Sequence, residues 1–137
     1  MSQIWRIYFI PANIVIQGLA KLLLKSIRSF DIACRWGGEE FVIVMPNMTL
    51  ETLRKRVEQL RLDVEQMQLR DGDQILEGIT ASFGIAVSES GITVKDFLNR
   101  ANQAMLEAKR TGKNRVMEYV NTYPIIKGLP NKKMFQN

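Results

Sequence analysis

The chain has no histidine and a single cysteine among its 137 residues. Without histidine it cannot build a Ser–His catalytic pair or a histidine metal site. One cysteine excludes an internal disulfide framework, which agrees with a reducing compartment. Cys34 alternates with Arg35 in a run of strand-forming residues, so we expect Cys34 in the core.

Long apolar runs are also scarce. Residues 7–20 carry no charge, but the stretch contains Pro11, Asn13 and Gln17, and it is shorter than the roughly 20 residues that a membrane span needs. It has neither a basic start nor a clear small-residue cleavage site, so we do not expect a signal peptide. The sequence therefore predicts a cytoplasmic domain without a membrane span.

Acidic residues are in the minority. Lys and Arg number 19 against 14 Asp and Glu, which gives a formal net charge of +5. Such an excess suits nucleic acid, an acidic membrane surface or a small anionic ligand. The basic residues are scattered, and the sequence shows no basic patch with interleaved aromatic residues, as single-strand binders have. A phosphate-rich nucleotide is therefore favoured over a nucleic-acid polymer as the partner.

The most informative motif is Gly37-Gly38-Glu39-Glu40, which stands between two strand-like apolar runs. Two such runs separated by two glycines predict a hairpin with a tight turn, because glycine accepts positive φ without penalty. The turn would present both glutamates at the edge of a sheet, where the missing Cβ atoms let a ligand approach. Carboxylates in such a place suit a magnesium ion that carries nucleotide phosphates. The alternative is a surface hairpin with two solvated glutamates.

The motif extends in both directions. Arg28 and Asp31 precede it with five residues between Asp31 and Gly37, and Phe41 follows it. The complete pattern, RxxD-x5-GGEEF, resembles the GGDEF domain family, the diguanylate cyclases, which join two GTP molecules into cyclic di-GMP. Residues 79–86 are similar to the following strand of that family, and residues 97–116 to its last helix and strand. The resemblance covers about residues 19–120.

The resemblance implies a catalytic site. Glu39 would bind metal and take part in catalysis, Glu40 would assist metal binding or orient the turn, and two magnesium ions are expected. Gly37 and Gly38 would lie against the substrate. Each subunit of a homodimer would hold one GTP, and an upstream sensory or receiver domain is expected.

Two further groups follow from the resemblance. Lys109 and Lys113 would hold GTP phosphates, although cations at a helix end can also simply complement the helix dipole. Lysine at position 113 keeps the charge of the family's more usual arginine but lacks its planar fork. Arg28 and Asp31 would form an inhibitory site for the product, completed by a second arginine, Arg56 or Arg61.

The remaining pattern completes the predicted fold. A strand at residues 5–10 precedes a helix at 12–29 with Pro11 in its first turn, and the hairpin follows. Thr49 and Thr93 are good N-caps for two later helices, which are separated by strands. This order predicts an α+β fold with a mostly antiparallel central sheet flanked by helices, similar to the ferredoxin-like palm of polymerases and nucleotide cyclases.

The chain departs from the family at both ends. The first strand of the family carries a metal-binding aspartate, but this chain has no acid before Asp31, and Asn13 is only a possible stand-in for a guanine-reading asparagine. Residues 123–135 resemble the family's opening segment, which here follows the last strand. We therefore expect one domain over residues 1–120, atypical over 1–18. The segment 121–137 would reflect permutation, a second truncated copy or a rearranged chain.

Three functions stay open at this stage. The first is a diguanylate cyclase domain, whose activity in this chain alone is expected to be weak because the first-strand acid is missing. The second is a non-catalytic receptor that binds cyclic di-GMP at Arg28 and Asp31. The third, less favoured, is a basic domain that binds nucleic acid.

Overall fold

The computed structural model describes residues 3–8 and 13–121 of the chain, with side chains from residue 13 onward. The predicted helical turn at Pro11 and the segment 123–135 therefore lie outside the described residues. In chain order the elements are β1 (Gln3–Tyr8), α1 (Asn13–Ser26), β2 (Ile32–Arg35), β3 (Glu40–Val44), α2 (Leu50–Glu65), β4 (Leu69–Asp71), β5 (Gln74–Leu76), β6 (Ser82–Val87), α3 (Val94–Arg110) and β7 (Val116–Glu118).

The central sheet has the strand order β2-β3-β1-β6-β7, and only β6 and β7 run parallel. The register places Tyr8 opposite both Glu40 and Ser82, and Phe83 opposite Val116. The end of β1 and the starts of β3, β6 and β7 therefore meet at one end of the sheet, which we call the motif end. This arrangement confirms the predicted α+β fold with its mostly antiparallel sheet.

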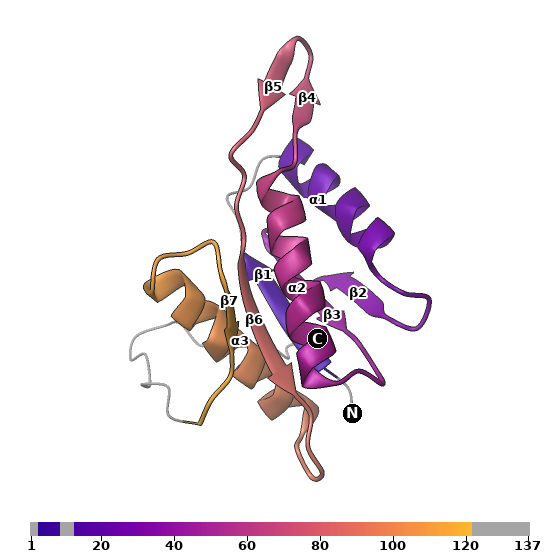
Figure 1. Ribbon diagram of the computed structural model, residues 1–137, viewed down its shortest axis with the longest axis vertical. Helices are drawn as coiled ribbons and strands as arrows, with labels where there is room; N and C mark the ends of the chain where they lie inside the picture. Colours follow the sequence, from indigo (N-terminus) through magenta and orange to yellow (C-terminus); the bar gives the residue numbers. More distant parts are fainter. Residues whose placement is uncertain (1–2, 9–12, 122–137) are drawn as a thin grey trace.

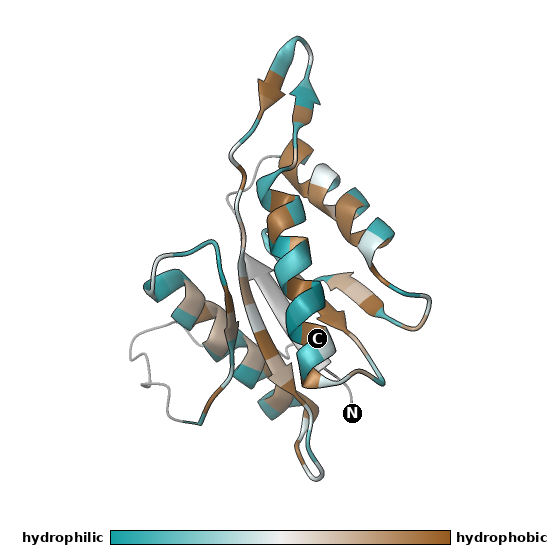
Figure 2. Ribbon diagram, in the orientation of Figure 1, coloured by the Kyte–Doolittle hydropathy of each residue, from teal (hydrophilic) through white to brown (hydrophobic). Residues whose placement is uncertain are grey.

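Helices cover both faces of this sheet (Figure 1). On one face α1 and α2 bury a cluster that includes Leu19, Leu53, Val57, Ile43 and Phe83. On the other face α3 buries a smaller cluster around Val42, Ala86, Phe97 and Ala101. Figure 2 shows hydrophobic residues along β3, β6 and β7 and hydrophilic residues on the outward side of α2. Val42 and Ile43 point to opposite faces because successive strand residues alternate.

Close contact between α3 and β6 depends on one glycine. A Cβ atom on Gly84 would lie 2.2 Å from both the carbonyl oxygen of Ala101 and the amide nitrogen of Met105. Any side chain at this position would push α3 away from the sheet. Because α3 leads directly into the loop before β7, this contact also fixes where that loop meets the motif end.

The predicted helix caps are confirmed. The side chain of Thr49 accepts a hydrogen bond from the Thr52 amide at 3.2 Å, and that of Thr93 accepts one from the Asp96 amide at 3.1 Å. Helix α3 ends at Arg110 with Thr111 as its C-cap, and the next residue, Gly112, has a φ of 128°, which is accessible to glycine. Each cap satisfies a helix-end backbone group that would otherwise have no intrahelical partner.

Some local expectations were wrong. Cys34 is exposed rather than buried, because β2 is the edge strand of the sheet. The hairpin β4–β5, whose first strand was not predicted, projects from the body of the molecule (Figure 1). Residues 79–81 precede β6 instead of belonging to it. Within the described ranges no helix is long and apolar enough to cross a membrane.

Candidate functional site

The Gly-Gly-acid-acid motif forms the predicted hairpin, but its loop is longer than a two-residue turn. The amide of Trp36 donates to the carbonyl oxygen of Glu40 at 2.7 Å, so Gly37, Gly38 and Glu39 form the loop itself. The left-handed φ expected for the two glycines is absent: it occurs at other glycines of the described chain. Open space adjoins the loop at Gly38, because a Cβ atom there would meet no heavy atom within 4 Å.

The two glutamates have different surroundings. Glu39 is half-buried within the loop, while Glu40 is the buried first residue of β3, 7% exposed. A Cβ atom on Gly37 would lie 3.6 Å from the Oε2 atom of Glu40, so this carboxylate reaches back beneath the loop. Glu39 is therefore the more accessible carboxylate, and Glu40 sits at the base of the same loop.

Sequence reasoning missed the role of Arg35 in this loop. Its Nε atom donates to the carbonyl oxygen of Gly37 at 3.2 Å, and its Nη2 atom to that of Gly38 at 2.9 Å. These contacts hold the backbone of the loop that carries Glu39. The only signal in the sequence was an arginine placed two and three residues before the glycines.

The predicted phosphate-binding lysines lie at the same end of the sheet as Glu39. Lys109 is half-buried in the last turn of α3, and Lys113 is exposed in the loop that leads into β7. The starts of β3 and β7 are three strand positions apart in the sheet order, which corresponds to roughly 14 Å at the usual strand spacing. The fold thus places the acidic loop and the Lys113 loop at the motif end.

A third cation at this helix end is already paired. The Nε atom of Arg110 donates to Glu107 at 2.8 Å, and its Nη2 atom contacts the same carboxylate. The hydrogen bonds from Arg110 lower the pKa of Glu107, although burial opposes this effect. Arg110 therefore serves as the partner of Glu107.

The number of carboxylates that lie close together limits how a metal ion could bind. Within the described residues, no three or more acidic, cysteine or histidine side chains come together, and the other parts of the chain contain no Asp or Glu. Magnesium can bind through one or two carboxylates when phosphate oxygens and water complete its shell. Glu39 and Glu40, adjacent in the motif, match that number of carboxylates, whereas two are too few for an all-protein cage around two ions.

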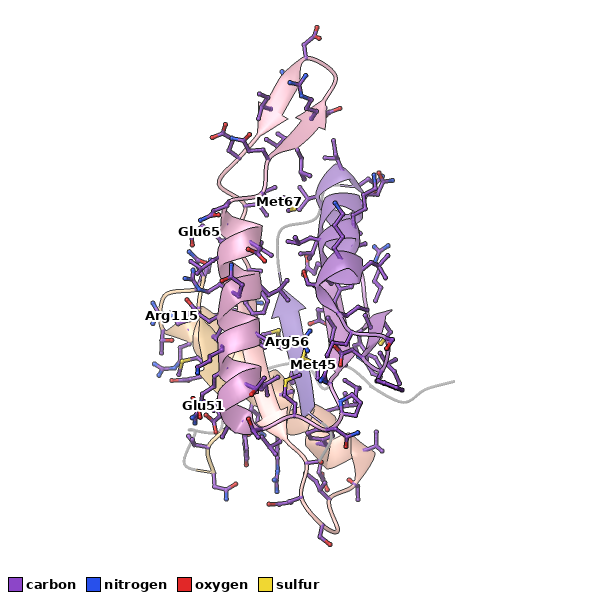
Figure 3. The ribbon with its side chains drawn as sticks, turned by 45° about the vertical axis from the view of Figure 1, so that its right-hand side comes forward. Met45, Glu51, Arg56, Glu65, Met67 and Arg115 are labelled. Atoms are coloured by element: carbon purple, nitrogen blue, oxygen red, sulfur yellow. The ribbon has the colours of Figure 1, made fainter. Side chains whose placement is uncertain are left out.

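The predicted product site is organised around Asp31. The side chain of Asp31 is fully buried. It accepts hydrogen bonds from the Arg28 amide at 2.7 Å, from Arg28 Nη2 at 3.0 Å and from Arg56 Nη1 at 3.2 Å. Arg56 also donates to the carbonyl oxygen of Ser26 at 2.8 Å, and Figure 3 shows it beside Met45, between α2 and the sheet. The carboxylate thus orients two arginines, of which Arg28 is the more exposed.

Of the two arginines considered for this site, only Arg56 contacts Asp31. Arg61 instead pairs with Glu58 and Glu65 on its own helix. Asp31 lies before β2 and the Gly-Gly loop follows β2, so the six residue steps from Asp31 to Gly37 separate the two sites by roughly 20 Å at the usual rise per residue. The arginine site and the acidic loop therefore lie at opposite ends of β2.

The ionisation of Asp31 reflects these contacts. Burial alone raises the pKa of this carboxyl, but the hydrogen bonds from the Arg28 backbone, Arg28 side chain and Arg56 side chain bring the pKa below its ordinary value. The folded protein therefore holds this carboxylate ionised more firmly than the unfolded chain does. Its contribution to stability is complete above the unfolded value of about 3.9 and is lost as pH falls through the lower folded-state pKa.

We expect Asp31→Asn to lower the free energy of unfolding at pH 7 by about 2 kcal/mol, because charge-assisted hydrogen bonds from two arginines lose their strength. Urea unfolding at pH 7 and between pH 3 and 5 measures this difference. The difference in free energy of unfolding between the original protein and Asp31→Asn should become smaller as pH falls below about 4. Glu51→Gln, which changes an exposed carboxylate, is the control and should leave the free energy of unfolding nearly unchanged. Equal free energies of unfolding for the original protein and Asp31→Asn at pH 7 would contradict this role of Asp31.

Comparisons with known proteins agree with this geometry. A family model described as "Diguanylate cyclase, GGDEF domain" matches residues 11–115. The chain is 35% identical over 105 residues to diguanylate cyclase VdcA of Vibrio cholerae, covering 75% of this chain and 31% of that protein. It is 33% identical over 106 residues to the response regulator PleD of Caulobacter vibrioides, covering 75% and 23%. The chain thus spans about a quarter to a third of these relatives.

Solved structures show the same arrangement. The active GGEEF domain of a diguanylate cyclase from Vibrio cholerae matches with a TM-score of 0.76 and 26% identity, covering 88% of this chain and 84% of that one. The GGDEF domain of DgcB from Caulobacter crescentus, solved with c-di-GMP, matches with a TM-score of 0.77 over 85% and 77% of the two chains. Because the identity is only 23%, this second match is evidence for the fold alone.

Proposed function

Because the chain belongs to the GGDEF domain family, we propose that it is the nucleotide-binding domain of a diguanylate cyclase, which condenses two GTP molecules into cyclic di-GMP. The observation that supports this most is the position of Glu39 and Lys113 at one end of the sheet. A carboxylate loop that can hold a metal and an exposed cation that can hold phosphate are the two groups that a nucleoside triphosphate needs.

The reaction is a double phosphoryl transfer. The 3′-hydroxyl oxygen of one GTP forms a bond to the α-phosphorus of the other, the bond from that phosphorus to pyrophosphate breaks, and the hydroxyl proton leaves. The same exchange in the opposite direction closes the ring and releases a second pyrophosphate. Each domain holds one GTP, so we propose that two copies of this domain face each other during the reaction.

The residues of this chain have separate tasks in that scheme. Glu39 and Glu40 would hold magnesium, which would supply a positive charge beside the phosphates and the attacking hydroxyl. The open space beside Gly38 would admit the phosphates close to the backbone of the Gly37-Gly38 loop. Lys113, together with Lys109, attracts the outer phosphates, and Arg35 holds the loop in place.

The setting of this domain follows from the same proposal. GTP supply places the domain in the cytoplasm, and a sensory or receiver domain in the same polypeptide would bring two copies together. Among solved relatives, diguanylate cyclase SiaD was captured with its activator SiaC. The proposal itself is tested by magnesium-dependent GTP binding in the original chain and in Glu39→Gln.

A second candidate function is a receptor for cyclic di-GMP. The observation that favours it is the convergence of Arg28 and Arg56 on the buried carboxylate of Asp31. The side chain of Arg28 is 44% exposed, and an arginine fork can donate to guanine O6 and N7 or to a phosphate. In this site Asp31 would hold the arginines in place, and Arg28 would meet the ligand first. Such a receptor needs no turnover at the acidic loop.

For this receptor site we expect Arg28→Ala to weaken cyclic di-GMP binding about thirtyfold, because a charged hydrogen bond contributes about 2 kcal/mol. Isothermal titration calorimetry measures the affinity. The matched control is Arg54→Ala, an exposed arginine that pairs with Glu118 of β7, at the opposite edge of the sheet from β2. Unchanged affinity in Arg28→Ala, or an equal loss in the control, would place the ligand elsewhere.

A further inference from the structure

The loop that carries Lys113 has an unusual backbone. Lys113 and Asn114 have φ angles of 62° and 43°, so two successive residues with side chains occupy the left-handed region. L-residues rarely adopt this conformation, although asparagine tolerates it better than most. A conformation of this kind persists only where surrounding contacts determine it. The loop therefore has to be held by specific partners.

The backbone of Lys113 is held on both sides. Its amide donates to the carbonyl oxygen of Ala108 at 2.9 Å, which closes the end of α3. Its carbonyl oxygen accepts from Arg115 Nε at 3.0 Å. The Arg115 guanidinium lies so close that a Cβ atom on Gly112 would be 2.4 Å from Nη2. With both polar backbone groups bound within the loop, the exposed side chain is the part of Lys113 that is available to a ligand.

Asn114 is held from a different part of the fold. Its Oδ1 atom accepts from Arg61 Nη1 at 3.0 Å, and its Nδ2 atom donates to Glu65 Oε2 at 2.7 Å. Arg61 Nη1 also lies 2.8 Å from Glu65 Oε2, which closes a triangle of three side chains. Figure 3 shows Glu65 and Arg115 on the same side of α2. The side chain of Arg61 is only 15% exposed, so this network is partly shielded from water.

The ionisation of the triangle agrees with its contacts. The hydrogen bond from Asn114, followed by that from Arg61, lowers the pKa of Glu65. Glu65 is therefore an ionised acceptor at neutral pH. The side-chain amide of Asn114 is hydrogen-bonded through both its oxygen and its nitrogen. An asparagine with both ends engaged by an arginine and a carboxylate has one orientation only.

We propose that Asn114, Arg61 and Glu65 are positioning residues that fix Lys113 at the motif end, so that its ammonium group meets the phosphates of a nucleotide bound at the Gly-Gly loop. This inference rests on the proposed nucleotide site. Its physical basis is that a loop ordered before binding loses less conformational freedom when the ligand arrives. The three residues thus assist phosphate binding without touching the ligand.

The test is a double-mutant cycle on the affinity for a magnesium-bound, non-hydrolysable GTP analogue, measured by calorimetry. Asn114→Gly removes the side chain but still allows the left-handed backbone. We expect it to weaken binding about fivefold and Lys113→Ala to weaken it about tenfold. In the Lys113→Ala background, Asn114→Gly should cause no further loss. Glu65→Gln should behave as Asn114→Gly does.

The outcomes distinguish failure of this inference from failure of the proposed nucleotide-binding function. Glu51→Gln, which removes an exposed ion pair with Lys55 on the same helix, should leave the affinity unchanged. An unchanged affinity in Lys113→Ala, or no binding by the original chain, would overturn the nucleotide site and the inference with it. An effect of Lys113→Ala without one of Asn114→Gly would overturn the inference alone. So would an Asn114→Gly loss that persists in the Lys113→Ala background, because it would not act through Lys113.

Discussion

Incubated with GTP and magnesium, the purified chain is expected to form cyclic di-GMP about a thousandfold more slowly than a GGDEF domain that carries a carboxylate on its first strand. The reason is the number of carboxylates. Glu39 and Glu40 are the acids of the hairpin loop, no third acid joins them within the described residues, and the chain has no acid before Asp31. A missing ligand that weakens transition-state stabilisation by about 4 kcal/mol lowers the rate by this factor.

Chromatographic separation of the nucleotides after timed incubation measures this rate. Cyclic di-GMP binding by the same preparation serves as the control for a correctly folded chain. Slow or absent product with intact binding favours the receptor function of Arg28, Asp31 and Arg56. Rapid product formation that depends on Glu39 would show that the two glutamates suffice, and it would contradict the expected deficit.

The second large effect concerns Glu39. We expect Glu39→Gln to weaken magnesium-dependent GTP binding about a hundredfold, which corresponds to about 2.8 kcal/mol. Glutamine keeps the size of the side chain but loses the charge that a hard cation such as magnesium requires. Because Glu39 is the more accessible of the two motif carboxylates, its loss should affect metal binding more than structure.

Calorimetric titration of GTP in the presence and absence of magnesium measures the effect of Glu39→Gln. Asp73→Asn is the control, since Asp73 is also a loop carboxylate and lies exposed in the turn of the projecting β4–β5 hairpin. An equal response to magnesium in the original protein and in Glu39→Gln would remove Glu39 from the metal site.

Much of the fold could be predicted because its signals are local. The caps at Thr49 and Thr93 each depend on a partner three residues ahead. The helical spacing of apolar residues and the glycines at the hairpin and at Gly112 are also short-range features. The order of the elements, and with it the α+β class, could therefore be predicted from the chain alone.

Apart from the local contacts of Arg35 with the Gly-Gly loop, the features that sequence reasoning missed or left open depend on distant parts of the chain. Cys34 is exposed because β2 lies at the edge of the sheet, and a strand's own sequence does not reveal its position. Arg56 reaches Asp31 across 25 residues, and Arg61 reaches Asn114 across 53. Both arginines belong to one helix, and the direction each faces depends on how that helix packs on the sheet. Their partners could therefore be assigned only in the folded structure.

The central claim is that the acidic hairpin loop and the Lys113 loop form one nucleotide site. The most direct measurement is an NMR titration with magnesium and a non-hydrolysable GTP analogue, followed at assigned backbone amides. The amides of residues 37–40 and 109–115 should shift together, with the same apparent affinity, and the shifts should depend on magnesium. Shifts confined to one of these loops, or centred on Arg28 and Asp31 instead, would contradict the claim.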